Sequence, residues 1–119
     1  MKYSALLFTL MLFGACEKES ATSGSLHARL EAAKTIGSQE PRDEALAKVA
    51  IDAAEAKEAD VATQAVQKIG DQHQRDNTAR TCALTLSKNG EAKAATIIAQ
   101  GIGDQAVRDN TLKEVAKGQ

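Results

Sequence analysis

The residues of this sequence that could do chemistry include an arginine–aspartate pair that occurs three times, at equal intervals along the chain. An arginine can hold a carboxylate through two parallel hydrogen bonds. In one interpretation each arginine pairs with acids of the same or the adjacent repeat; in the other, the arginines form a ladder for a carboxylate-bearing partner. An enzyme site instead brings different residues together at one unique place, so we expect no catalytic residue and no enzyme. The candidate partner-binding residues are Arg42, Arg75 and Arg108.

The second cysteine of the chain, Cys82, favours a structural role. It stands midway between Val49 and Val115, in step with the arginine–aspartate pairs. Both valines are expected in the core, so we expect Cys82 to pack as a small apolar residue. A reactive or intermolecular thiol is the alternative, and it requires an exposed side chain.

The histidines and acidic residues do not form a pattern typical of a metal or catalytic site. His27 and His73 lie far apart in the sequence and form no zinc-ligand spacing with each other or with Cys82. We therefore expect no metal and no cofactor. An acidic cluster early in the repeat region is typical of a solvated helix start; it consists of Glu40, Asp43 and Glu44.

The first 15 residues have the pattern of a signal peptide. After the positive Lys2, residues 4–13 form an apolar stretch of ten residues, far short of the roughly 20 that span a bilayer as a helix. The stretch ends in Leu12-Phe13-Gly14-Ala15-Cys16, which resembles the lipobox of bacterial lipoproteins. Phe13 stands where a lipobox usually has leucine. Ordinary signal-peptide cleavage requires a small residue at this position, and Phe13 matches that requirement even less well. A secreted protein or an uncleaved anchor is the alternative.

The resemblance implies that Cys16 becomes the first residue and carries lipid on its thiol, with an acyl chain such as palmitate on its amine. Two or three chains anchor a protein firmly. Glu17 replaces the aspartate that retains lipoproteins in the inner membrane of enteric-type bacteria, so the resemblance favours the outer membrane of the bacterial cell envelope. Residues 16–24 are small and polar, and they predict a tether with a reach of about 15 Å.

Charge and aromatic content exclude several function classes. The formal net charge of the 119 residues is −1, so no basic field favours nucleic acid. All three aromatic residues, Tyr3, Phe8 and Phe13, lie in the leader. The remaining chain therefore has no ring on which to stack a base, a sugar or a quaternary cation.

The sequence after the tether repeats with a 33-residue period, because Ile36-Gly37-Ser38-Gln39 recurs in nearly the same form at residues 69–72 and 102–105. Each unit predicts two antiparallel helices that meet at this motif. We expect the glycine to end the first helix in a left-handed conformation and the next residue to cap the second helix. The predicted first helices are near 25–35, 58–68 and 91–101, and the predicted second helices are near 39–55, 72–88 and 105–117. The predicted caps are Ser38, Asp71 and Asp104.

These patterns predict an all-α fold: a short solenoid of about three helix-turn-helix repeats in residues 25–119, with units near 25–56, 57–89 and 90–119. Period and pattern resemble the tetratricopeptide-like class of α-α repeats, although the tryptophan and tyrosine positions of that class are absent. Repeats of this class usually bind proteins or peptides. The resemblance implies a lipid-anchored module for protein–protein interaction or envelope assembly, with an unknown envelope protein as partner. The alternative is a structural or stress-related lipoprotein that self-associates, since the last unit lacks a polar capping helix.

Overall fold

The computed structural model describes residues 24–118, in which every regular element is an α-helix. This confirms the all-α prediction. The signal peptide, Cys16 and the tether up to residue 23 lie outside the described residues, whereas Gly24 belongs to the first described helix and not to the tether. The helices are α2 (Gly24–Lys34), α3 (Gln39–Glu55), α4 (Ala59–Lys68), α5 (Gln72–Lys88), α6 (Ala92–Gln100) and α7 (Gln105–Lys117).

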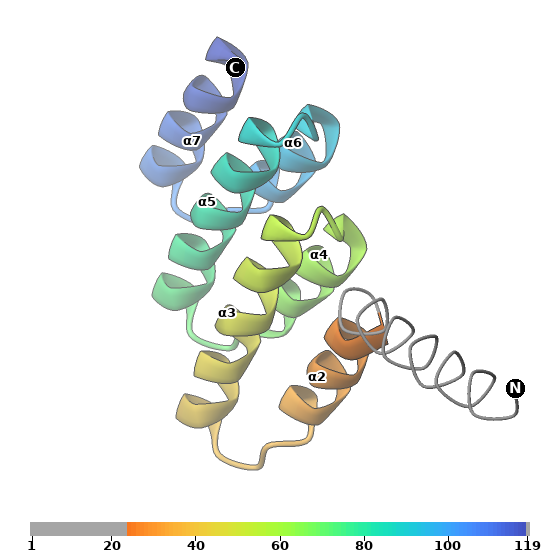
Figure 1. Ribbon diagram of the computed structural model, residues 1–119. Coiled ribbons are helices and arrows are strands. Elements are labelled where there is room, and N and C mark those ends of the chain that lie inside the picture. The colour runs from red at the N-terminus through yellow and green to blue at the C-terminus, as the bar shows by residue number, and fades with distance from the viewer. Residues whose placement is uncertain (1–23, 119) are drawn as a thin grey trace, which may run out of the picture.

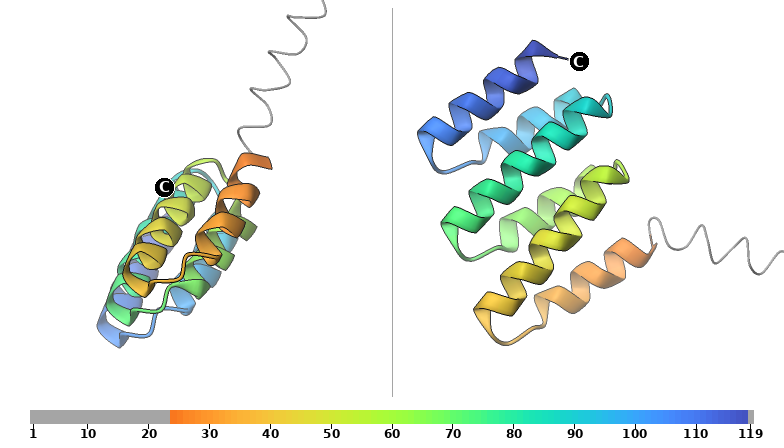
Figure 2. Two further views of the ribbon diagram at one scale, coloured as in Figure 1. Left: turned by 90° about the horizontal axis from the view of Figure 1, so that it is seen from below. Right: turned by 60° about the vertical axis from the view of Figure 1, so that its left-hand side comes forward.

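The helices form two layers. The longer helices α3, α5 and α7 lie side by side in one layer, and α2, α4 and α6 lie in the other (Figures 1 and 2). Alanine supplies much of the buried core, in which the larger side chains include Leu30, Leu46, Ile69, Leu86 and Ile102. Small side chains let helices approach closely, so apolar surface is buried without aromatic residues. None of the helices in residues 24–118 has the length and apolar character to cross a bilayer.

The turns from α3 to α4 and from α5 to α6 have the same geometry. Lys57 and Gly90 occupy equivalent positions in successive units, and both adopt a left-handed conformation, with φ of 63° and 84°. The backbone N–H after each donates to a carbonyl five residues back, from Glu58 to Ala53 and from Glu91 to Leu86, both at 2.8 Å. This pattern is a common helix C-terminus. The residues around Lys57, Glu55 to Glu58, favour a helix by their type. Helix α3 nevertheless ends here, because Lys57 adopts the left-handed conformation.

Two details of the predicted motif turns are wrong. The positive-φ glycines of the described chain are Gly90 and Gly118, so Gly37, Gly70 and Gly103 do not adopt the left-handed conformation. At Gly70 and Gly103 the reason for glycine is close approach: an added Cβ would lie 2.9 Å from the Nε2 atoms of Gln39 and Gln72.

The second error concerns the cap of α3. Asp71 and Asp104 accept hydrogen bonds from the N–H groups of Gln74 (2.8 Å) and Val107 (3.0 Å), as predicted. Ser38 is the N-cap residue of α3, as predicted, but its side chain accepts no cap hydrogen bond. The equivalent third position of α3 is Pro41, which has no N–H to donate.

Candidate protein-binding groove

The three candidate arginines each fasten the turn that precedes their own helix. The Nη1 atom of Arg75 donates to the carbonyl oxygen of Ile69 at 3.0 Å. Arg42 and Arg108 make the same bond to Ile36 and Ile102, at 3.1 and 3.0 Å. The pairing with acidic side chains considered from the sequence is thus replaced by a contact with the backbone. A guanidinium has five donors, so most of them remain for other partners.

The aspartates that follow Arg42 and Arg75 reach forward to the next motif turn. Asp43 accepts from the backbone N–H of Gly70 at 2.9 Å and of Asp71 at 3.0 Å. Asp76 accepts in the same way from Gly103 and Asp104, both at 3.0 Å. We call this arrangement the aspartate clamp. It joins α3 to the start of α5, and α5 to the start of α7.

Asp43 was expected in a solvated helix start, and that expectation is wrong, since Asp43 is 1% exposed and Asp76 4%. Burial by itself raises the pKa of each carboxyl. The two backbone N–H groups, the side chain of Gln39 or Gln72, and the charge of the preceding arginine outweigh burial and hold both pKa values below the usual range. The charged form is therefore the one that the fold stabilises.

The third aspartate of the series is in a different environment. Asp109 occupies the equivalent position on α7 but is exposed. Within the described residues it accepts no hydrogen bond. The repeated Arg-Asp pair therefore contains two buried clamps and one free carboxylate.

A groove runs between α4 and α6, and sequence reasoning did not identify it. It consists of two adjoining hollows of about 290 and 280 Å³ that share Thr63 and Ile97. Ile97 is 54% exposed and is the exposed large apolar side chain of the described chain. Arg75 lines the first of these hollows. The lining residues are Ala59, Asp60, Thr63, Gln64, Val66, Gln67, Arg75, Ala94, Ile97, Ile98 and Gly101.

The hollow at the equivalent place between α2 and α4 is smaller and more basic. Its volume is about 230 Å³, and its lining includes Lys34, Arg42 and Lys68. Gly101 occupies the repeat position of Lys68 one unit later, and its missing side chain leaves the α4–α6 groove open. Arg42 and Arg75 therefore line different hollows. A signal for the groove was present in the sequence: Ile97 aligns with Glu31 and Gln64, so an apolar residue replaces polar ones.

The remaining candidates fit structural or surface positions. Cys82 is fully buried, and burial raises the pKa of its thiol to about 12, which makes the thiolate scarce at neutral pH. His27 and His73 are exposed, and a ring nitrogen of His73 lies 3.1 Å from the amide nitrogen of Asn77. In residues 24–118 no three His, Cys, Asp or Glu side chains gather as metal ligands would.

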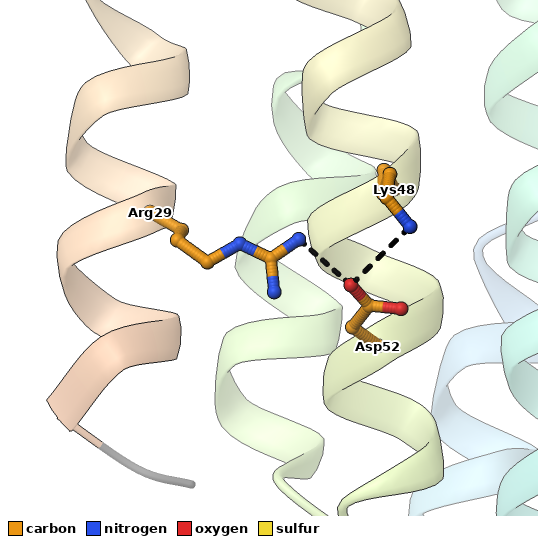
Figure 3. A network of polar contacts seen from close by, with 3 residues as sticks. All are labelled: Arg29, Lys48 and Asp52. Atoms are coloured by element: carbon orange, nitrogen blue, oxygen red, sulfur yellow. Dashed lines mark hydrogen bonds and ion pairs between the residues drawn. The ribbon is translucent and has the colours of Figure 1, made fainter. Parts of the chain in front are cut away.

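A polar network joins α2 to α3 at the first end of the molecule. Asp52 accepts from Arg29 at 2.7 Å and lies 3.7 Å from the Nζ atom of Lys48 (Figure 3). All three side chains are partly exposed, so solvent screens the attraction and its contribution is about 1 kcal/mol or less. The network neutralises part of the positive charge at this end.

No protein-family model, no curated protein and no solved structure matches this chain.

Proposed function

We propose that this chain is a lipid-anchored protein-binding module of the bacterial cell envelope, on the outer membrane, with no catalytic role. Its described part is a short solenoid of three units with a 33-residue period. The recurring clamps support this architecture, because the bond pattern from Asp43 to Gly70 and Asp71 returns one unit later from Asp76. The lipobox-like segment before Cys16 supports the anchor.

The observation that carries the binding proposal is Ile97. An isoleucine that is 54% exposed between two hollows places apolar surface where a partner side chain can bury it. Burying a whole side chain of this size stabilises a complex by about 1.5 to 3 kcal/mol, and roughly half of that remains available here.

Charge selects the partner. Arg75 lines one hollow of the groove and Asp60 lines the other, while Lys34, Arg42 and Lys68 line the neighbouring hollow between α2 and α4, so the basic side chains outnumber the acidic one. An arginine with free donors binds a carboxylate in a planar, two-bond geometry. The proposed ligand is therefore an acidic segment of another envelope protein that presents one bulky apolar side chain to Ile97.

The binding test uses a fluorescently labelled acidic peptide with a central leucine, and the same peptide with serine in its place. We expect the full chain to bind the leucine peptide, and Ile97→Asp to weaken binding at least about tenfold, because it replaces apolar contact with charge repulsion. Gln100→Asp adds the same charge on an exposed position of α6 and is the matched control. Equal binding of both peptides, or equal loss in both variants, contradicts the proposal.

The anchor has a separate test. In a bacterial host supplied with labelled palmitate, the full chain is expected to take up label and to sediment with membranes. Cys16→Ser is expected to lose both properties, since the thiol that would carry the lipid is absent. Membrane attachment that survives Cys16→Ser would show that the leader acts as an uncleaved anchor instead.

A second candidate function is self-association, and the exposed Asp109 is the observation that favours it.

A further inference from the structure

The two ends of the helix stack carry the two halves of one aspartate clamp. At the last unit, Asp109 offers a carboxylate with no partner among the described residues. At the first unit, the motif turn Gly37-Ser38 is exposed, and neither backbone N–H donates to a group in the described chain. Asp43 and Asp76 accept from this same pair of N–H groups one unit later. Acceptor and donors are therefore both available, at opposite ends.

An apolar stripe accompanies the free carboxylate. On α3 and α5 the residues three and seven positions after the clamp aspartate are buried; they are Leu46, Ala50, Ala79 and Ala83. On α7 the equivalent residues are Leu112, which is only half-buried, and Ala116, which is exposed. Residues at this spacing share one helix face. The face of α7 that carries Asp109 thus keeps the apolar pattern of an internal junction, but no helix of residues 24–118 covers it.

The opposite end offers a hollow for such a stripe. A mainly apolar hollow of about 380 Å³ lies between α2 and α3. Its apolar lining includes Ala32, Ile36 and Ala45, and the side chains of Arg29 and Lys48 also line it. Ala32 is exposed and the other two are half-buried. At the equivalent positions of the second unit, Ala65, Ile69 and Thr78 are buried. The first unit therefore exposes the surface that the second unit buries.

Gly37 supplies an independent observation. Its conformation does not require glycine, and a Cβ added there would meet nothing within 4 Å. At Gly70 and Gly103 the added Cβ meets the glutamine of the preceding unit at 2.9 Å. The contact that explains glycine in the second and third motif turns is thus not made to the first turn by any residue from 24 to 118. Gln105 is the glutamine of the series without such a glycine beside it.

We propose that copies of this chain associate head to tail. Asp109 of one copy accepts hydrogen bonds from the N–H groups of Gly37 and Ser38 of the next, Gln105 lies over Gly37, and Leu112 and Ala116 of the first copy enter the hollow of the second. The proposal rests on the repeat architecture proposed above, but it does not use the α4–α6 groove. Such an interface joins two different surfaces, so a row of copies keeps one unused surface at each end, to which further copies can add.

One residue of the first end differs from the internal junctions. Arg29 stands where the second and third units have Ala62 and Ala95, both fully buried. Its guanidinium already donates to Asp52 of its own chain at 2.7 Å, so its charge is paired before any docking (Figure 3). The incoming helix α7 has 13 residues, against 17 in α3 and α5. A shorter helix leaves more room for the larger side chain.

The test measures sedimentation of the full chain in a mild detergent, with micelles in large excess so that two copies rarely share one. The chain is expected to form a concentration-dependent series of oligomers. Asp109→Ala is expected to weaken association at least about tenfold, because two hydrogen bonds to a charged group are lost. Gly37→Leu, which a single chain accommodates, is expected to block the other surface. Asn110→Ala, next to Asp109 and also exposed, is the matched control and is expected to associate like the wild type.

Mixing the two blocked variants gives the decisive measurement. Asp109→Ala keeps the donor end and Gly37→Leu keeps the acceptor end. At concentrations at which each variant alone is monomeric, the mixture should therefore form a one-to-one dimer and stop there. Ile97→Asp should associate normally, which separates this interface from the groove. A wild-type chain that stays monomeric at every concentration overturns the proposal, and so does association that neither Asp109→Ala nor Gly37→Leu reduces.

Discussion

Replacing Asp76 by alanine tests whether the aspartate clamps hold the units together. The carboxylate is 4% exposed and accepts two backbone hydrogen bonds of 3.0 Å across the junction between α5 and α7. Asp109 provides a control within the same chain, since the same residue type stands at the same repeat position in an exposed place.

The expected loss follows from these contacts. A hydrogen bond to a charged group contributes about 1.5 to 3 kcal/mol to stability. The cost of burying the carboxylate offsets part of what the two hydrogen bonds contribute together. We expect Asp76→Ala to lower the free energy of unfolding by roughly 3 kcal/mol. For a domain of this size that corresponds to a fall in Tm of roughly 12 to 24 °C. Asp109→Ala should change the free energy of unfolding by less than about 0.5 kcal/mol.

The assay is urea unfolding followed by far-ultraviolet circular dichroism, which suits a helical chain without tryptophan. A Cys16→Ser background removes the proposed lipid, and dilute protein avoids association. Asp76→Asn should lie between alanine and wild type, because the amide keeps one neutral acceptor. Equal losses in Asp76→Ala and Asp109→Ala, or a loss below about 1 kcal/mol in Asp76→Ala, would refute the reasoning.

Four further outcomes are expected. The pKa values of Asp43 and Asp76 are lower in the folded chain than in the unfolded chain. The two carboxylates therefore stabilise the fold at pH values above the unfolded pKa near 4, and this contribution is lost as the pH falls through the folded pKa values. The Tm should drop over this acidic range, and it should drop less steeply in the Asp43→Asn, Asp76→Asn double variant. The thiol of Cys82, with its pKa near 12, should react with Ellman's reagent only after unfolding, and Cys82→Val should cost less than about 1 kcal/mol. Ser87→Ala should leave the Tm unchanged or raise it, because the buried hydroxyl of Ser87 has no partner in the described chain, and a fall of several degrees would contradict this. Gly90→Ala should lower the free energy of unfolding by about 1 kcal/mol in urea titrations, since its φ of 84° strains other residues.

The helices could be predicted from the sequence because their signals are local. The described helices begin and end within about one residue of the predicted ranges, since the recurring Ile-Gly motif and the caps Asp71 and Asp104 act on neighbouring residues. The error at Ser38 was also local and avoidable, because Pro41 lacks the N–H that the cap needs.

The role of the aspartates could not be predicted in the same way. Asp43 and its first clamp partner, Gly70, are 27 residues apart, and their contact depends on how successive units stack. An aspartate in the first turn of a helix looks solvated when only its neighbours are considered. The groove was missed for a related reason: the exposure of Ile97 depends on the hollows between α4 and α6, although its difference from Glu31 and Gln64 was visible in the alignment of the units.

The forward reach of each clamp has a consequence for the length of this protein. Asp43 and Asp76 each supply a carboxylate to the turn before the next long helix, so the two junctions that the structure describes use the same groups, as the proposed repeat units require. In a tandem duplication of residues 71–103, Gly103 of the first copy would be followed by Asp71 of the second copy. Asp76 of the first copy would then meet a Gly-Asp turn at the new junction, and the two existing clamps would keep their partners. Gene duplication could therefore lengthen the molecule by a whole unit and keep an aspartate clamp at every junction.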